Sequence, residues 1–502
     1  MQEPEPYSSP VSSGAPDDSN DLPDKTPHRV GGLSIGGLVS WIVILLLTAL
    51  LVGSIAIQQF FAVNEIGGDA TSGDLMQVQL QARTVVGQNN LSEIVPGGGN
   101  QKTPVPKELN GGCYEQRLCF VTLKGETDDA AAALSVLDDL DQKVEEHDLE
   151  LTENQTRLRS LLGQLYQQYS IGDFDSQFLS DEDSEFLKER LGFCGQLALL
   201  PDGTPLEAQR DELVVGAATK LLIMAVAGLF GILIFLAGFV FAVVYLYLLA
   251  SGKFQARLEP SLTDHNVYIE TFAIWLVIFF GSSLVMGGFV TDAKLQMLLQ
   301  PIIFFGSLFC LVWPVVRGVS FSQVRRDIGW TLSDPFMDLV TTPFTYVASL
   351  PLLVPGFIIV ILAAALLGLV QESHEFARQA TPGHPIQEYI SSGNVLMITL
   401  VFITACVAAP VVEETMFRGV FYRHLRELSS RYARWFSVFL SACINGFIFA
   451  AIHPQGLIAI PVLMSLAFCF SLAREWRGSL VSPIAMHAIH NTLITCFSLL
   501  IL

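Results

Sequence analysis

Nine long apolar stretches in this chain of 502 residues decide what it can fold into. A helix needs about 20 consecutive apolar residues to cross the hydrocarbon core of a bilayer, and its backbone polar groups must be satisfied within the segment. The sequence therefore predicts an all-α polytopic membrane protein with about nine transmembrane helices. The stretches cover residues 38–61, 221–250, 271–290, 295–316, 345–370, 395–412, 436–452, 457–472 and 480–502.

The acidic residues are gathered in one region between the first two stretches. Residues 63–212 hold 28 Asp and Glu against 11 Lys and Arg, whereas residues 213–502 hold 14 acids and 15 bases. A nucleic-acid-binding protein needs a basic surface against phosphate, so this function class is excluded and no nucleic-acid partner is expected. We expect an acidic, mainly helical domain at 63–212, joined to a nearly neutral body of transmembrane helices.

The bases of the body predict an orientation, because cytoplasmic loops carry an excess of Lys and Arg. If the N-terminus is cytoplasmic, the short outer loops hold only Lys294 and Arg378. We therefore expect a multi-pass protein of the cell membrane, in contact with the lipid bilayer, with residues 1–37 as a disordered cytoplasmic tail, 38–62 as a signal anchor and 63–212 as an extracytoplasmic domain. The inner loops would hold Lys253, Arg257, Arg317, Arg325, Arg326, Arg423, Arg426, Arg431, Arg434, Arg474 and Arg477.

A seven-residue repeat of apolar side chains runs through the acidic region. It predicts a helix that begins near Thr127, and it leaves two interpretations open: a coiled coil for self-association or partner binding from Leu137 to Leu165, or one helix of a small bundle. A second helix is expected to begin at Ser180, whose hydroxyl can cap it. The repeat consists of Leu137, Val144, Leu151, Leu158 and Leu165.

Three cysteines, Cys113, Cys119 and Cys194, lie in the acidic region, and five lie in apolar stretches. In an oxidising compartment one disulfide can form, either Cys113–Cys119 or Cys119–Cys194, and the third thiol stays unpaired.

Ionisable residues inside spans are costly and are candidates for function. In this chain they cluster in the last hundred residues as Glu413, Glu414, Arg418, His453 and His487, together with Asn491. Glu414 and Arg418 are four residues apart on a helix and can pair, which leaves Glu413 about 100° round the helix. A carboxylate, imidazoles and a carboxamide can activate water and stabilise an oxyanion, as a hydrolase requires. The alternative is a set of buried polar pairs that hold helices together.

These residues fall in three motifs that resemble a known family. Residues 413–418 match E-E-x-x-x-R, residues 449–453 match F-x-x-x-H, and residues 487–491 match H-x-x-x-N. In order and spacing they resemble the CPBP family, also called Abi, which includes type II CAAX prenyl endopeptidases and bacteriocin-processing or immunity proteins. The resemblance covers about residues 393–502, with residues 324–330 as a further match to the lead-in of the family; residues 213–392 are the remaining transmembrane body.

The resemblance implies an intramembrane endopeptidase that cuts a membrane-associated protein or peptide. It implies that Glu413 activates water as general base with His453, that His487 and Asn491 stabilise the oxyanion, and that Glu414 and Arg418 form a structural pair. A divalent metal such as zinc, held by Glu413, His453 and His487, is left open. So is an alternative function, a catalytically inactive scaffold or immunity protein that binds a partner through its extracytoplasmic domain.

One expectation conflicts with this mechanism. If the span of residues 395–412 ends at the membrane edge, Glu413 and His453 lie about 20 Å or more apart at 1.5 Å of rise per residue. Pro410 can interrupt its helix, so the predicted boundaries, rather than the motif, are expected to change.

Overall fold

The computed structural model describes residues 33–64, 69–70, 72–94, 102–174, 179–253, 256–258, 264–332, 334–370, 389–390 and 394–501. Most of the predicted cytoplasmic tail and Arg378 lie outside these residues. Within them, every regular element is a helix, so the predicted all-helical class is confirmed.

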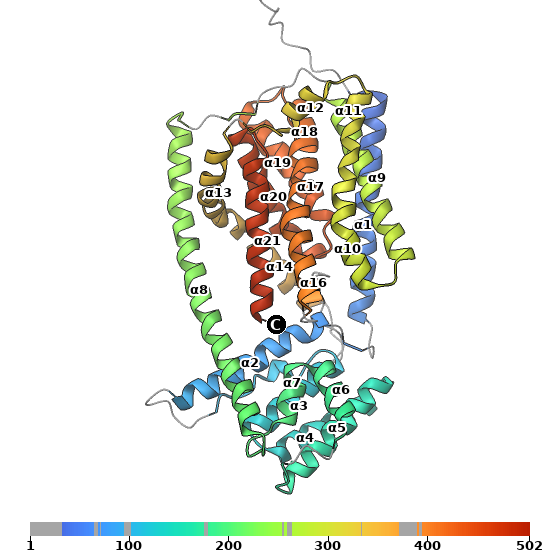
Figure 1. The fold of residues 1–502 in the computed structure, drawn as a ribbon, viewed down its shortest axis with the longest axis vertical. Helices are drawn as coiled ribbons and strands as arrows, with labels where there is room; N and C mark the ends of the chain where they lie inside the picture. Colours follow the sequence, from blue (N-terminus) through green and yellow to red (C-terminus); the bar gives the residue numbers. More distant parts are fainter. Residues whose placement is uncertain are drawn as a thin grey trace, which may run out of the picture.

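Nine candidate membrane spans occur in the described residues, one for each predicted stretch. They stand side by side as a bundle, with the helices of the acidic region (residues 63–212, called the acidic domain below) at one end (Figure 1). The spans are Ile35–Ile57, Glu207–Ala250, Asn266–Phe289, Ala293–Val316, Pro335–Leu366, Val395–Leu428, Arg434–Ala451, Leu457–Arg477 and Val481–Leu500.

Some spans are single helices. They are α1 (Ile35–Asn64), α8 (Glu207–Ala250), α9 (Asn266–Phe289), α19 (Arg434–Ala451) and α21 (Val481–Ile501). The others are composite: α10 (Ala293–Ser307) with η3 (Leu308–Val312) and α11 (Trp313–Val316), α13 (Pro335–Ser349) with η4 (Leu350–Leu353) and α14 (Val354–Val370), and η7 (Leu457–Ala459) with α20 (Ile460–Arg477). A short helix, α12 (Phe321–Ile328), lies between α11 and α13.

The sixth span is much longer than predicted. Its helical path continues from Val395 to Leu428, 16 residues beyond the predicted end at Val412. Pro410 therefore does not end the span; it stands at the start of a short α-helix that directly follows a π-helical segment. The path consists of α16 (Val395–Phe402), the π-helix η5 (Ile403–Ala408), α17 (Ala409–Glu414), the π-helix η6 (Thr415–Phe421) and α18 (Tyr422–Leu428).

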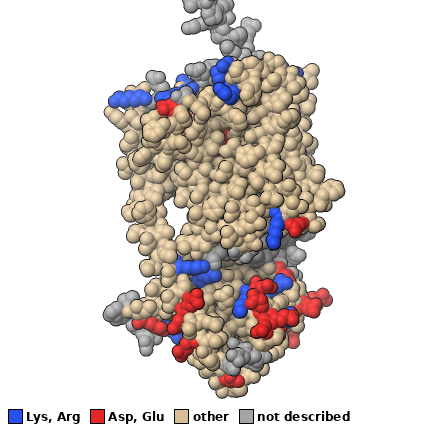
Figure 2. All heavy atoms as spheres, viewed as in Figure 1, with Lys and Arg blue, Asp and Glu red and all other residues tan. Residues whose placement is uncertain are grey.

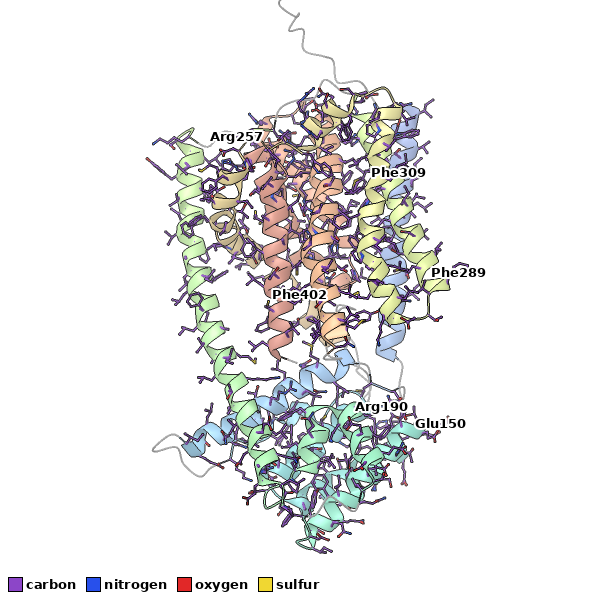
Figure 3. The ribbon with its side chains drawn as sticks, viewed as in Figure 1. Glu150, Arg190, Arg257, Phe289, Phe309 and Phe402 are labelled. Carbon is purple, nitrogen blue, oxygen red and sulfur yellow. The ribbon has the colours of Figure 1, made fainter. Side chains whose placement is uncertain are left out.

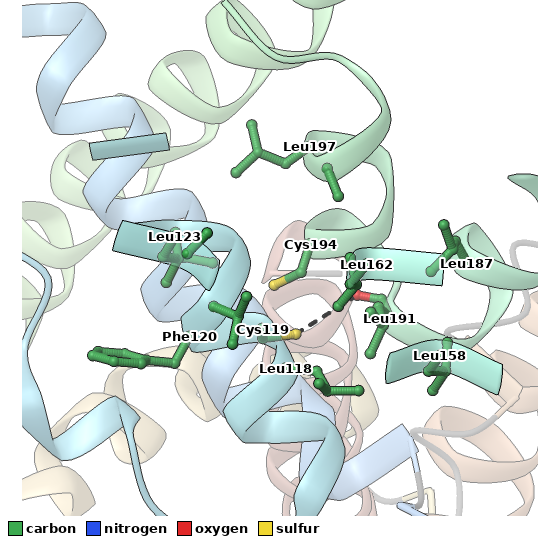
Figure 4. Close-up of a cluster of buried hydrophobic side chains, with 14 of the residues drawn as sticks. Leu118, Cys119, Phe120, Leu123, Leu158, Leu162, Leu187, Leu191, Cys194 and Leu197 are labelled. Carbon is green, nitrogen blue, oxygen red and sulfur yellow. Dashed lines mark hydrogen bonds between the residues drawn. The ribbon is translucent and has the colours of Figure 1, made fainter. Parts of the chain in front are cut away.

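The acidic domain is a small helical bundle with its own apolar core, whose centre is drawn in Figure 4. The first turns of α8 pack onto it through α2, so α8 runs without interruption from this domain into the membrane bundle (Figure 1). Its helices are α2 (Ser72–Ile94), η1 (Lys107–Leu109), α3 (Tyr114–Thr127), α4 (Ala130–Glu146), α5 (Glu153–Ser170), α6 (Asp181–Leu191) and α7 (Phe193–Leu199).

The predicted single heptad helix is wrong, because the repeat is split between α4 and α5. The chain turns between them, with Asp148 in the left-handed region at φ 51°. Leu137, Leu158 and Leu165 are buried in the domain core, so the leucine stripe packs inside its own domain, as the bundle interpretation expects. The second helix begins as predicted, with the Ser180 hydroxyl accepting a hydrogen bond from the Asp183 amide.

All eight cysteines are free thiols in the structure, so neither predicted disulfide is present. Cys119 on α3 and Cys194 on α7 both lie in the domain core, where Figure 4 shows them beside each other, and the Cys119 thiol faces the carbonyl oxygen of Leu191. Burial, together with the neighbouring Cys194 thiol, holds the pKa of the Cys119 thiol well above its usual range.

Charges are unevenly distributed between the two ends of the molecule. Basic side chains gather at the end of the bundle away from the acidic domain, whereas acids dominate the surface of that domain (Figure 2). Arg257 lies at the first end, and Glu150 and Arg190 lie at the second (Figure 3). The apolar Phe289 and Phe309 lie along the bundle between these ends, and both are exposed on its outer surface.

Candidate active site

The long sixth span brings Glu413 to the middle of the bundle. Glu413 lies 15 residues before the end of α18, which is about 22 Å along a helix. The next span, α19, begins at Arg434 beside that end, and His453 lies just past its other end at Ala451, 19 residues from Arg434 or about 28 Å. The two side chains therefore reach similar depths. The expected separation of about 20 Å is wrong, because it took the membrane edge to be at Val412.

Two of the predicted side chains, His453 and His487, meet at the carboxylate of Glu413. His453 Nε2 lies 3.7 Å from Glu413 Oε2, and His487 Nε2 lies 4.0 Å from the same oxygen. Oε2 is buried and has no hydrogen-bond partner among the described residues. Both distances are too long for direct hydrogen bonds but suit a bridging water.

The other nitrogen of each imidazole is already engaged. His453 Nδ1 contacts the carbonyl oxygen of Phe449, one turn earlier. His487 Nδ1 lies 2.9 Å from Glu414 Oε1. A backbone carbonyl can only accept a hydrogen bond, so His453 carries a proton on Nδ1. In its neutral form, the Nε2 lone pair of His453 then faces Glu413.

Glu414 is the centre of a fully buried ionic cluster. Its Oε1 accepts a hydrogen bond of 2.8 Å from Arg418, as the four-residue spacing predicts, and also contacts His487. The Arg418 guanidinium donates a second hydrogen bond to the Ala467 carbonyl and lies 4.6 Å from the ring centroid of Phe449 and 5.2 Å from that of Phe470. Burying a charge is costly unless it is paired, and this cluster supplies the pairing.

Asn491 lies one turn beyond His487 on α21. Its amide nitrogen donates a hydrogen bond of 2.7 Å to the carbonyl oxygen of Ala405 in η5. π-Helical turns shift the backbone register and are frequent at functional sites. The π-helices η5 and η6 flank α17, which carries both glutamates, and Asn491 joins α21 to the first of them.

A second layer of contacts fixes the helix that carries the glutamates. The indole nitrogen of Trp330 donates to Thr415 Oγ1 at 3.0 Å, next to Glu414. Arg474, fully buried on α20, donates to the carbonyl oxygens of Arg418 and Asp327. The segment 324–330, which the sequence predicts to resemble the family's lead-in, packs against the site helix, because α12 lies on η6.

Sequence reasoning missed two features of the site. The contact between His487 and Glu414 joins residues 73 positions apart, and Glu414 was assigned only to Arg418. The ring of Phe470 stacks on His487 with a centroid distance of 5.2 Å, yet a phenylalanine in an apolar span carries no signal. Phe449 was visible in the F-x-x-x-H motif, and its ring lies 4.1 Å from that of His453.

Glu413, His453 and His487 are the residues that the sequence offers as zinc ligands. In the part of the chain that the structure describes, no group of three or more His, Cys, Asp or Glu side chains is arranged to hold a metal ion. The Nδ1 atom of His487 is engaged by Glu414, and its Nε2 atom stands 4.0 Å from Glu413. As placed in the structure, Glu413, His453 and His487 therefore do not form a ready-made metal site.

Comparison with known proteins places the site in a family. Residues 395–493 match the family described as "Type II CAAX prenyl endopeptidase Rce1-like". The chain is also 31% identical over 117 residues to an "Uncharacterized 24.3 kDa protein" from Escherichia coli; the match covers 23% of this chain and 52% of that protein. This chain thus spans about half the length of that relative. No solved structure matches. The C-terminal region of this chain is therefore an Rce1-like type II CAAX prenyl endopeptidase domain of the CPBP family.

Proposed function

We propose that this protein is an intramembrane endopeptidase that hydrolyses a peptide bond in a membrane-associated protein or peptide. One observation carries the proposal: two imidazole Nε2 atoms face the same buried carboxylate oxygen, that of Glu413, at 3.7 and 4.0 Å in the middle of the bundle. The Glu413 carboxylate oxygen and the Nε2 lone pair of His453 are two acceptors that face each other, which suits a water molecule with two protons to donate. The family of the C-terminal domain supports the same reaction class.

In the proposed reaction Glu413 is the general base. It takes a proton from water held between its carboxylate and His453, and the water oxygen bonds to the carbonyl carbon of the substrate. The carbonyl oxygen becomes an oxyanion. When the tetrahedral intermediate collapses, the carbon–nitrogen bond breaks and Glu413 returns the proton to the leaving amine. No step requires a group that the chain does not supply.

His487 and Asn491 are proposed to stabilise the oxyanion. His487 can donate from Nε2 when Nδ1–H is held by Glu414, so this role requires a proton on both nitrogens. The Asn491 amide has two N–H donors and gives one of them to Ala405, which leaves one for the oxyanion. In this proposal Glu414 and Arg418 position His487 and do not touch the substrate.

A comparison of protein termini in cells tests the proposal. Cells that produce the wild-type chain or the Glu413→Gln variant at equal levels would be compared by mass spectrometric mapping of the termini of their membrane proteins. We expect a set of termini that is present with the wild type and absent with the variant. Identical termini in both cells would reject the protease and leave the inactive scaffold or immunity protein.

We also propose that the N-terminus is cytoplasmic and that the acidic domain lies outside the cytoplasm. The support is the excess of bases at the end of the bundle opposite this domain (Figure 2). Cysteines introduced at exposed positions, Glu150→Cys in the domain and Arg325→Cys on α12, give a matched test with a membrane-impermeant maleimide. In intact cells we expect Glu150→Cys to be labelled more strongly than the chain without an added cysteine. Arg325→Cys should be labelled no more than that chain. The reverse pattern would invert the topology.

A further inference from the structure

A cavity of about 990 Å³ lies where α8 leaves the acidic domain for the membrane bundle. Its walls come from α2, α6, α7 and α8, and the proposed reaction uses none of its residues. This volume falls in the range of small-molecule sites. The cavity is therefore separate from the proposed active site.

The α8 wall places the cavity at the edge of the bilayer. Leu213, Gly216, Ala217 and Lys220 line it from one face of α8, because their spacing of three and four residues repeats with the helical turn. Lys220 is also the last charged residue on α8, and residues 221–252 contain no Asp, Glu, Lys or Arg. Such a position corresponds to the headgroup region, where the hydrocarbon begins.

The charges set into the cavity wall are positive. Five charged residues line the cavity, and the two half-buried ones are Arg83 and Lys220, whereas Asp181, Lys188 and Glu212 are exposed to water. Half-buried charges are screened less than exposed ones. The Arg83 guanidinium is also held, 5.1 Å from the ring centroid of Phe193. The cavity lining thus holds three bases and two acids, whereas residues 63–212 as a whole hold 28 acids and 11 bases.

The same face of α8 continues as an apolar, uncovered surface beyond the cavity. Ile223, Ala227 and Phe230 follow Lys220 at helical spacing, and the side chains of Ile223 and Phe230 are 45% and 66% exposed. A cavity with inward-facing bases at one end of an exposed apolar stripe is complementary to an amphiphile with an anionic head and an acyl chain.

We propose that the cavity binds the phosphate of an anionic membrane phospholipid through Arg83 and Lys220, with its acyl chains along the exposed face of α8. The bound lipid joins α2 of the acidic domain to the membrane-spanning part of α8. It thereby fixes the domain at the membrane surface. The proposal is independent of peptide hydrolysis, so either can fail alone.

Native mass spectrometry of the full chain in detergent tests this site. Three probes would be titrated: phosphatidylglycerol, phosphatidylcholine with the same acyl chains, and inorganic phosphate. We expect the wild type to retain phosphatidylglycerol selectively. The double variant Arg83→Gln/Lys220→Gln should bind it about tenfold or more weakly, because each substitution removes a charge-assisted hydrogen bond to phosphate. The control Lys102→Gln/Lys143→Gln removes the same charge from the domain outside the cavity and should bind like the wild type.

A charge-preserving variant guards against misfolding as the cause. Arg83→Lys/Lys220→Arg should keep phosphatidylglycerol binding within a few-fold of the wild type, and both double variants should match the wild type in helical content by circular dichroism. Equal retention of phosphatidylcholine, equal loss in the Lys102 and Lys143 control, or tight binding of inorganic phosphate without lipid would each overturn the proposal.

Discussion

The Nδ1 atom of His487 lies 2.9 Å from Oε1 of Glu414, and this contact separates the functions of two consecutive glutamates. Glu414 is turned towards His487 and Arg418 and is fully buried. The Oε2 atoms of both glutamates have no hydrogen-bond partner among the described residues, but only that of Glu413 faces the Nε2 atoms of the two histidines. One carboxylate is thus held by its partners, and the other remains available for chemistry.

The two glutamates should differ in their effect on stability. Glu414→Gln removes one charge of a buried pair and leaves Arg418 without its carboxylate, a loss on the order of 3–5 kcal/mol. Glu413→Gln removes a buried charge that has no ion-pair partner at hydrogen-bond distance, so the variant should unfold at or above the wild-type temperature. Thermal unfolding of the three proteins in detergent measures this. A Glu413→Gln variant that is less stable than Glu414→Gln would contradict the assignment.

The two histidines of α21 should differ in their effect on catalysis. His487→Ala removes a proposed oxyanion donor, so we expect cleavage of the protein that accumulates uncut in Glu413→Gln cells to slow by about 10²–10³-fold. His490 contacts the Tyr346 hydroxyl at 3.1 Å instead, and His490→Ala should stay within a few-fold of the wild type. Initial cleavage rates of the purified proteins decide this, and equal losses would remove His487 from the proposed mechanism.

Removal of metal ions should leave the proposed reaction intact, because every step is assigned to a side chain. Exhaustive treatment of the purified protein with a zinc chelator, followed by dialysis into metal-free buffer, should leave the cleavage rate unchanged. Loss of cleavage that added zinc restores would show that Glu413, His453 and His487 act as metal ligands, the alternative that the sequence leaves open.

The buried thiols of the acidic domain should resist alkylation. Burial raises the pKa of Cys119, so the unreactive thiol form persists as the pH rises from neutral into the mildly alkaline range, where an ordinary thiol ionises. We expect maleimide to label Cys119 and Cys194 only after the protein is unfolded, and no reductant should be needed for this labelling. A cysteine introduced at an exposed position, Glu150→Cys, is the control that should react in the folded protein. A requirement for reductant would reveal one of the disulfides that the sequence leaves open.

Much of the membrane architecture follows from sequence because span length and apolarity are local properties. The end of the sixth span cannot be predicted in this way, because Arg418, Arg423 and His424 give residues 413–428 a polar sequence. In the structure these side chains are buried within the bundle, with 0%, 3% and 0% exposure, and each has partners there. A hydropathy pattern cannot detect polar residues whose partners lie on other helices.

The site shows the same division between local and distant contacts. The pair of Glu414 and Arg418 follows from a four-residue helical spacing. The contact between Glu414 and His487 depends on how α17 packs against α21, which no spacing encodes. The heptad failed for a related reason: its period continues across the turn at Asp148, so the pattern does not reveal that two helices share it.

The most direct test of the central claim is cleavage by the purified chain reconstituted in lipid vesicles. The substrate would be the membrane protein that accumulates uncut in Glu413→Gln cells, supplied in the same vesicles. If Glu413 is the general base, the wild-type chain cuts the substrate, and Glu413→Gln does not cut it although it unfolds at the same or a higher temperature. Cleavage by Glu413→Gln at the wild-type rate would rule out this function of Glu413.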